Sequence, residues 1–596
     1  MNIWDFFKSS KAKVKFKQLH GARVILPKSR EVKYSPAERK AAFKELNSAL
    51  HKDFGKEGMN FHPDFTWPTQ IWENNLFIVG SSGSGKTQVL KRVFDEVRKV
   101  GSDGFLPKIG TPLKKKPGFV LYDIKGDFTE YYAGEPDVAL LGDWDKRSVV
   151  LDIGKDIKSA REISLFSSIF YPAPANESGN SKFFREISIK IIETVLKTLI
   201  VERGEKWDWT NLYVELVSIN DNVDKLISLA REIESALQQE DEEGKISKNE
   251  TIENIKVSLI SVIDTMGTFA IPLLSKSINY RKISLTEFLE NKTHYRTLIL
   301  KDNATFKKVS GPYFTFILSF LTTKIMDMDD TSEKRLFLGL DEAGQLPKIP
   351  NFISNLMIFR SKGCVIIYGI QDINQIRTQY GDKGMITFLG AFNTRLYGRI
   401  SEAKEAEDLV KALGVSEFEE RKYSRGKSSG RKGSKNENES VNIIKKDNML
   451  PSHLTEIPSG GKLGALVRFW LKISGIPVIL VDWEIKAFEK KYLNTVPAVW
   501  IEKNVLNFDF KTYESRENLK KYNKKKQKEF QKEQYQKFCE DIKAEKVIDN
   551  KNRSEMKDSN DLLEHELLED FEVEKSIDKP QKKSVKKKKT LKKLEM

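Results

Sequence analysis

The stretch Gly80-Ser81-Ser82-Gly83-Ser84-Gly85-Lys86-Thr87 constrains the fold of this chain more than any other. It follows the apolar run 76–79 and precedes a helical pattern of apolar residues over 88–94. A strand, a glycine-rich turn and a helix in this order predict a phosphate-binding loop, because glycines let backbone N–H groups approach phosphate oxygens. In such a loop Lys86 reaches the β- and γ-phosphates and the Thr87 hydroxyl binds Mg²⁺. A chance match on a surface loop is the competing interpretation, and the flanking elements count against it.

A second stretch ends in two acids, since the apolar run 336–340 is followed by Asp341 and Glu342. In ATPases with a phosphate-binding loop, the first acid holds Mg²⁺, directly or through water, and the second activates the attacking water. Many strands end in a capping acid, so this signal is weak alone. Paired with residues 80–87 it predicts ATP and Mg²⁺ as cofactors. We expect the two features at the carboxyl ends of neighbouring parallel strands.

Four further polar residues follow strand or helix patterns. Asp123 and Lys125 follow an apolar run beginning at residue 118, so Asp123 is a candidate to hold Mg²⁺ or a water, and Lys125 to touch phosphate or a neighbouring subunit. A capping aspartate and a solvated lysine explain the pattern equally well. Gln371 ends the run 364–370 and can sense the γ-phosphate or orient water. Arg360 ends a predicted helix, and its position alone slightly favours a cation beside the helix dipole over an arginine finger.

The bulk properties favour a multidomain protein with an anionic partner. The 596 residues exceed what one hydrophobic core organises. The net charge of +16 favours nucleic acid or an acidic membrane surface as the partner. Cys364 and Cys539 give neither a metal-binding spacing nor a disulfide framework, which favours the cytoplasm. No stretch reaches the roughly 20 apolar residues of a membrane span, and the aromatic N-terminus fits either a frayed end or a weak interfacial helix.

The predicted fold class is α/β: a mostly parallel sheet flanked by helices, with an all-helical domain inserted between its second and third strands. The expected parts are, in order, a lead-in (1–70), the first part of the nucleotide-binding domain (71–154), the all-helical insertion (155–290), the second part of the nucleotide-binding domain (291–487) and a charged tail (488–596). Within the lead-in, Ser35 and Pro36 open a helix. Residues 422–438 are expected to be a flexible basic loop, and the tail to be largely disordered.

Several short motifs, in order along residues 20–487, resemble the type IV coupling proteins of conjugation systems, the TraD/TrwB kind. The motifs are His20-Gly21-Ala22-Arg23, Tyr122-Asp123-Ile124-Lys125-Gly126, Asp145-Lys146-Arg147-Ser148, Asp341-Glu342 with Leu346-Pro347, Arg360-Ser361-Lys362-Gly363, Tyr368-Gly369-Ile370-Gln371, Gln375, Tyr380-Gly381 and Asn393-Thr394-Arg395. The resemblance implies a RecA-like hexameric ATPase that binds DNA. It also implies that Arg360 is an arginine finger and Gln371 a nucleotide sensor.

The function implied by the resemblance is ATP-driven movement of DNA, or of a relaxase–DNA complex, to a type IV secretion channel during conjugative transfer. The expected partners are DNA bound without sequence preference, the relaxase or relaxosome, type IV secretion proteins and further copies of this chain in a homo-hexamer. Family members usually begin with transmembrane helices and this sequence shows none. Three explanations stay open: a membrane-anchoring partner recruits the chain, its basic aromatic N-terminus touches the membrane, or it belongs to a soluble branch of the family. The expected location is the cytoplasm or the inner face of the cell membrane. The alternatives are an FtsK/HerA-like double-stranded DNA translocase and a non-motor ATP-binding adaptor that recruits protein cargo.

Overall fold

The structure is a computed structural model that describes residues 13–20, 23–28, 32–56, 58–99, 117–142, 144–171, 179–233, 248–274, 281–331, 335–427, 435–458, 460–461 and 464–498. The chain divides into two units, residues 1–507 and 508–596, and the described residues all belong to the first. The charged tail predicted over 488–596 therefore lies outside the described residues from position 499 onward.

A ten-stranded sheet forms the centre of the described unit, with the strand order β2-β17-β16-β13-β5-β12-β11-β6-β10-β7. From β13 to β7 every neighbouring pair is parallel, whereas β16 runs antiparallel to both β13 and β17. The strands span, in that order, Val24–Ile25, Val478–Glu484, Leu466–Ile473, Thr394–Tyr397, Leu76–Val79, Cys364–Ile370, Leu336–Leu340, Gly118–Asp123, Thr297–Lys301 and Val138–Leu141. Continuous apolar runs such as that of β5 suit strands buried on both faces, which confirms the predicted fold class.

Two expectations about this sheet are wrong. Strand β12 lies between β5 and β11, so the glycine-rich loop and the acid pair follow strands that are not neighbours. The order of parallel strands depends on the path of their crossover connections, which local sequence does not encode. The short strand β7 was also missed, and it places the helical insertion after a third strand instead of a second. Four apolar residues carry no periodicity that separates a strand from a helix.

Alternating strand residues contribute to two hydrophobic cores, one on each face of the sheet. Phe77 and Val79 belong to the first core, whereas Leu76 and Ile78 belong to the second. The first core is covered by α7 (Ala160–Phe170), α12 (Leu285–Leu289), α13 (Lys307–Met326), α14 (Phe352–Phe359), α15 (Asn374–Gly390) and α16 (Ala403–Ala412). The second core is covered by α2 (Pro36–Phe54), α3 (Thr69–Trp72), α4 (Lys86–Lys99) and α5 (Thr129–Tyr132).

The described part of the N-terminal lead-in packs against the end of the sheet. Helix α2 begins as predicted, with Pro36 in its first turn and a reciprocal capping pair between Ser35 and Glu38, in which the Ser35 N–H donates to the Glu38 carboxylate at 2.9 Å. The hairpin of β3 (Gly58–His62) and β4 (Phe65–Pro68) follows. Arg39 Nε lies 2.9 Å from Asp482 Oδ1 on β17, so the N-terminal helix is tied to a strand near the other end of the described chain.

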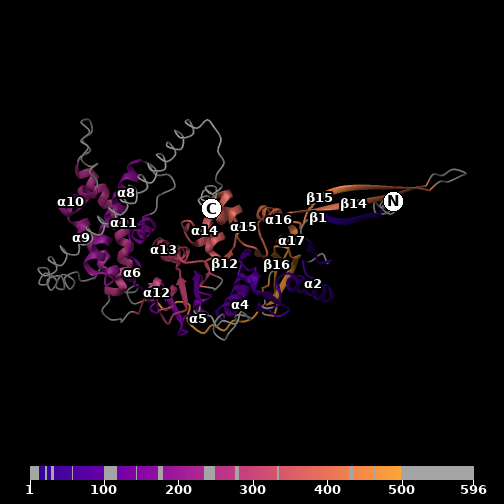
Figure 1. The fold of residues 1–596 in the computed structure, drawn as a ribbon, viewed down its shortest axis with the longest axis horizontal. Helices are drawn as coiled ribbons and strands as arrows, with labels where there is room; N and C mark the ends of the chain where they lie inside the picture. Colours follow the sequence, from indigo (N-terminus) through magenta and orange to yellow (C-terminus); the bar gives the residue numbers. More distant parts are fainter. Residues whose placement is uncertain are drawn as a thin grey trace, which may run out of the picture. The chain divides into compact units, whose positions relative to one another are not determined.

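Four helices of the inserted region, α8 (Gly179–Arg203), α9 (Trp209–Asp221), α10 (Val223–Ile233) and α11 (Lys248–Leu274), are grouped together in Figure 1, and α6 (Ile153–Asp156) and α7 precede them in the chain. The chain enters and leaves this region near a parallel pair of short strands, β8 (Val150–Leu151) and β9 (Lys282–Ile283). The helical structure of these segments agrees with the expected all-helical insertion, of which residues 234–247 lie outside the described residues. None of the described helices has the length and apolar character needed to cross a membrane.

The predicted flexible loop over 422–438 is mostly a β-hairpin. Strands β14 (Val415–Lys427) and β15 (Lys435–Asp447) pair along their whole length, and β1 (Lys13–His20) adds to β14, forming the long ribbon in Figure 1. The abundance of Gly, Ser, Lys and Arg that suggested a loop was misleading, because pairing between the strands defines this ribbon. Residues 428–434 lie outside the described residues.

Candidate functional site

The glycine-rich loop connects β5 to α4 at the carboxyl edge of the sheet. Its first residue is tied to the neighbouring strand, because the Gly80 N–H donates to the Ile370 carbonyl at 3.2 Å. Gly83 and Gly85 have φ angles of 75° and 90°, a region that side chains disfavour. The Ser84 hydroxyl is buried and has no hydrogen-bond partner among the described residues. An unsatisfied donor inside a loop of this shape fits a site that takes phosphate oxygens.

Lys86 begins α4 and is 5% exposed. Its ammonium group donates to the Gly80 carbonyl at 2.6 Å and lies 3.8 Å from Glu342 Oε1. Burial lowers the pKa of Lys86, and the nearby carboxylates of Glu342 and Asp341 oppose this change. The side chain therefore lies folded over the loop, between its carbonyl groups and the acid pair, where added phosphate charge would stabilise its charged form.

The acid pair follows β11 directly. Asp341 is 4% exposed, and burial, with repulsion from Glu342, raises its pKa to about 7. Glu342 behaves in the opposite way: burial favours its neutral form, but Lys86 and hydrogen bonds from Lys125 and Gln371 outweigh this effect and lower its pKa. Glu342 is therefore an ionised base at neutral pH, whereas Asp341 is only partly ionised there, and a nearby cation would favour its ionised form.

Glu342 also has an unusual backbone conformation. Its φ and ψ of 53° and 38° lie in the left-handed region, which costs a residue with a side chain about 1–2 kcal/mol. The following 3₁₀ turn, η3 (Ala343–Gln345), begins at this point. Local strain of this kind tends to persist where it fixes a functional side chain. Here it holds the carboxylate toward Lys125, whose Nζ lies 2.5 Å from Glu342 Oε1.

The structure brings together most of the residues predicted for the site. Lys86, Lys125, Asp341, Glu342 and Gln371 all interact at the carboxyl edge of the sheet. The sequence suggested that Lys125 touches phosphate or a neighbouring subunit, whereas in the structure its side chain contacts Glu342. The half-buried Thr87 follows Lys86 in the first turn of α4, as the phosphate-loop pattern requires.

The sequence left two roles open for Asp123, metal binding and capping of a turn, and the structure shows the capping contacts. One carboxylate oxygen accepts the Gly126 N–H at 2.8 Å. The other accepts the N–H groups of Phe128 and Thr129 at 3.1 and 2.7 Å and the Thr129 hydroxyl at 2.8 Å. The side chain is 2% exposed. These bonds engage both oxygens and shape the loop after β6, so Asp123 positions Lys125 and Gly126.

Arg360 lies away from the other predicted residues. It is exposed at the C-terminus of α14, four residues before β12 begins. The acid pair follows the carboxyl end of β11, which is parallel to β12. A seven-residue strand spans roughly 20 Å, so Arg360 and Glu342 lie near opposite edges of the sheet. Arg360 therefore cannot act on the site of its own chain.

Arg399 was not identified from the sequence, although it lies beside the glycine-rich loop. The Ser81 N–H donates to the Arg399 carbonyl at 2.8 Å, and an Arg399 Nη donates to the Ser82 carbonyl at 3.3 Å. Arg399 follows β13, the other neighbour of β5. Its position just after a strand that ends at the same edge was the available signal, since ligands bind along that edge in α/β folds.

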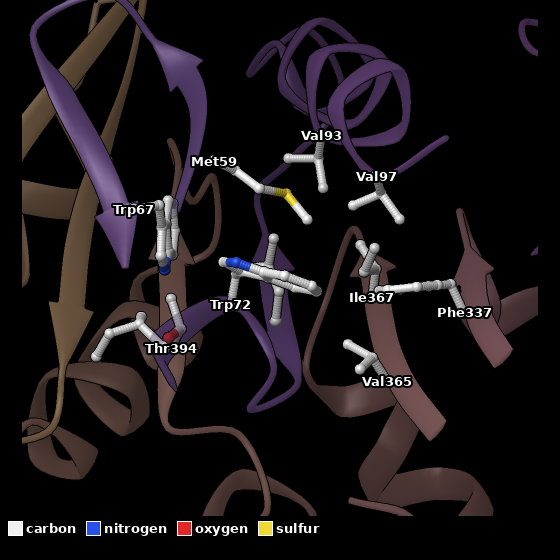
Figure 2. Close-up of a pocket in the computed structure, with 11 residues that line it drawn as sticks. Met59, Trp67, Trp72, Val93, Val97, Phe337, Val365, Ile367 and Thr394 are labelled. Carbon is white, nitrogen blue, oxygen red and sulfur yellow. The ribbon is translucent and has the colours of Figure 1, made fainter. Parts of the chain in front are cut away.

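A small apolar cavity lies at the amino ends of the strands, opposite the edge that carries the glycine-rich loop, and Figure 2 shows the side chains that line it. Its volume is about 20 Å³, and it lies between α3, α4 and the amino ends of several strands, including β13. Two polar atoms at this apolar cavity, Trp72 Nε1 and Thr394 Oγ1, are buried without a hydrogen-bond partner among the described residues. The cavity is too small for more than one water molecule and is separate from the acid pair.

Comparison with known proteins identifies the family. Residues 62–481 match the family described as the type IV secretion-system coupling protein DNA-binding domain. The coupling protein TraD of Escherichia coli (strain K12) is 21% identical over 346 residues, which cover 58% of this chain and 44% of TraD. The chain thus spans less than half the length of that relative.

Solved structures share the fold. The bacterial conjugative coupling protein TrwBdeltaN70, in an unbound form, has a TM-score of 0.58 at 16% identity, covering 81% of this chain and 97% of that one. TrwB in complex with the non-hydrolysable ATP analogue ADPNP has a TM-score of 0.57 at 15% identity, covering 82% and 99%. The family match extends over more than half of the chain, from the lead-in through the acid pair to β17. The chain belongs to the type IV secretion-system coupling proteins.

Proposed function

We propose that this chain is an ATP-driven, DNA-binding coupling ATPase that moves DNA, or a relaxase–DNA complex, to a type IV secretion channel during conjugative transfer. The observation that carries the proposal is the meeting of Lys86, Asp341 and Glu342 behind a glycine-rich loop, in a member of the coupling protein family. TrwB structures in complex with ADPNP, and with ADP and Mg²⁺, support ATP and Mg²⁺ as the cofactors.

The described side chains divide the chemistry between them. Bound Mg·ATP supplies the phosphoryl group and a metal charge. Lys86 neutralises the β- and γ-phosphates, while Thr87 and Asp341 hold the metal, directly or through water. Glu342 takes the proton of the attacking water, which its lowered pKa allows at neutral pH. Gln371 hydrogen-bonds to Glu342 and orients this base.

Arg360 supports a ring assembly. Because it lies at the other edge of the sheet from Glu342, it can stabilise transition-state charge only at the site of a neighbouring copy. An arginine supplied in this way makes each site incomplete without its neighbour. We therefore propose that the active form is a homo-oligomer, a hexamer by resemblance, in which ATP binds between subunits.

DNA binding is proposed to be electrostatic and independent of sequence, in keeping with a net charge of +16. Among the described side chains of the β14–β15 ribbon, two lysines already pair with acids of the same ribbon, which lowers the positive charge that they offer to DNA. Lys422 lies 2.9 Å from Glu420 and Lys445 lies 3.3 Å from Glu417. Further proposed partners are the relaxase, secretion-channel proteins and a membrane-anchoring protein. The chain would then work in the cytoplasm or at the inner face of the membrane.

ATP hydrolysis by the purified full chain tests this function. It is measured without nucleic acid, with single-stranded DNA and with double-stranded DNA, at low and at moderate salt. DNA should stimulate hydrolysis, and the stimulation should fade as salt rises, because phosphate contacts release counterions. The form of DNA that stimulates more strongly identifies the substrate.

The variant Lys86→Ala should abolish hydrolysis and leave the fold intact. A matched control is Lys99→Ala, which removes an exposed lysine at the other end of the same helix. Hydrolysis that ignores both forms of DNA would count against a translocase and favour an adaptor. Hydrolysis by the Lys86→Ala protein would contradict the assignment of the site.

A further inference from the structure

A segment outside the nucleotide-binding motifs crosses the site edge of the sheet. Residues 485–498, which we call the strap, follow the last strand, β17, and contact α4 and α5 in turn. The Lys486 N–H donates to Gln88 Oε1 at 3.2 Å, and Gln88 Nε2 donates back to the Lys486 carbonyl at 3.1 Å. Further along, the Tyr492 N–H donates to the Glu130 carbonyl at 3.0 Å. The strap therefore lies against the first turn of the phosphate-loop helix and against α5.

The end of the strap is held by the turn after β7. The carboxylate of Asp145, which is fully buried, binds the Arg147 guanidinium at 2.7 Å and accepts the Val496 N–H at 3.1 Å. The same guanidinium donates to the carbonyls of Leu493 and Asn494 at 2.8 and 3.1 Å. This buried ion pair fixes the backbone on both sides of Asn494, so its side chain has a defined position.

Asn494 hydrogen-bonds to two lysines, Lys125 in the loop after β6 and Lys301 at the end of β10. Its Nδ2 donates to the Lys125 carbonyl at 2.8 Å, and its Oδ1 accepts from Lys301 Nζ at 2.7 Å. It packs so closely on Gly126 that a Cβ there would overlap its amide group, and Gly126 has a φ of 82°. The peptide that carries Lys125 is thereby clamped from outside, while Asp123 shapes it from inside.

We propose that Asn494 is a positioning residue for ATP hydrolysis: it holds the Lys125 backbone so that the Lys125 ammonium meets Glu342. The proposal rests on the proposed ATPase function. The Lys125 side chain is 46% exposed and is long enough to take many conformations, whereas its Nζ lies 2.5 Å from Glu342 Oε1. A fixed backbone reduces the entropy that this contact costs. The strap then contributes to catalysis, although it contains neither the glycine-rich loop nor the acid pair that define the nucleotide-binding site.

Three variants of the full chain test the role of Asn494. Asn494→Ala removes both hydrogen bonds. Asn494→Asp keeps the shape and the bond to Lys301 but replaces the donor to the Lys125 carbonyl with an acceptor. Leu493→Ala is the matched control, because the neighbouring Leu493 side chain is 69% exposed. Both Asn494 variants should lower kcat about five- to tenfold, as expected for one lost positioning hydrogen bond, with KM for ATP within about twofold of the wild type.

The split between kcat and KM separates positioning from a loss of stability. A positioning role lowers kcat in both Asn494 variants and leaves KM for ATP and the melting temperature close to those of Leu493→Ala. A merely structural role would lower the melting temperature and leave kcat of the folded protein unchanged. Normal kcat in Asn494→Asp would overturn the proposal.

A readout that needs no hydrolysis completes the test. Hydrogen exchange of the backbone amides over residues 124–129, measured without nucleotide, should be faster in both Asn494 variants than in Leu493→Ala. Equal exchange in all three would overturn the positioning role. Faster exchange in a chain whose wild type hydrolyses no ATP would instead overturn the proposed function while upholding the clamp on Lys125.

Discussion

Replacing Asp341 with asparagine should stabilise the nucleotide-free protein, and more so at high pH. Burial and the charge of Glu342 raise the pKa of Asp341 from an ordinary value of 3.8 to about 7. Between those values the folded chain retains a proton that the unfolded chain has lost, so the free energy of unfolding falls as pH rises through this window. In the Asp341→Asn protein the free energy of unfolding does not fall in this way, because an amide does not ionise.

The magnitude follows from the two pKa values. Relative to the wild type, the gain in the free energy of unfolding should be about 4 kcal/mol at pH 8 and about 1–2 kcal/mol at pH 5. The difference between the two conditions, about 3 kcal/mol, does not depend on how well the amide packs. The substitution should also abolish hydrolysis, because Mg²⁺ loses a proposed ligand. Asp341 would thus destabilise the nucleotide-free protein and be retained because the protein needs it when Mg·ATP is bound.

Urea unfolding at pH 5 and pH 8, in the presence of a chelator, measures the effect. Asp264→Asn on the exposed face of α11 is the control for removing one negative charge, and it should behave alike at both pH values. If Asp341→Asn changed the free energy of unfolding equally at pH 5 and pH 8, the carboxyl group would titrate normally. The account of a buried, metal-dependent acid would then be refuted.

Three further outcomes are expected. Arg360→Ala and Glu342→Gln proteins should each be inactive alone but regain part of their hydrolysis when mixed, because a mixed ring contains intact pairs; no recovery on subunit exchange would contradict action between subunits. Thr394→Val should raise the free energy of unfolding by about 1 kcal/mol, since it removes a buried hydroxyl without a described partner, and a loss would instead indicate an ordered water in the cavity. Ser35→Ala should cost about 1 kcal/mol in thermal unfolding through loss of the α2 cap, and an unchanged melting temperature would show that this end of the helix frays.

Features that depend on a few adjacent residues were predictable from the sequence. The phosphate loop is defined by a strand, glycines and a helix that follow one another directly, and the acid pair by the run before it. The cap at Ser35 is equally local. The fold class and the family are confirmed on this basis. The domain boundaries and the roles of individual site residues stay predictions.

Features that depend on distant partners were not predictable. That Asp123 caps a turn depends on which groups face it, and these include the Phe128 and Thr129 N–H groups. The clamp on Lys125 comes from Asn494, 369 positions later in the chain. The ribbon was missed because its stability comes from pairing with partners, including β1, and not from its own composition.

The pairing of β1 with β14 has a consequence for how the chain is made. Lys13 pairs with Tyr423, so the first described strand finds its partner only after roughly 400 further residues have left the ribosome, which takes roughly 20–80 s at typical rates of synthesis. Arg39 of helix α2 can contact its partner Asp482 only after a still longer interval. Throughout that interval the newly made N-terminus has an unpaired edge open to other chains. Truncated products should therefore be cleaved readily within β1, whereas the finished protein should be protected there.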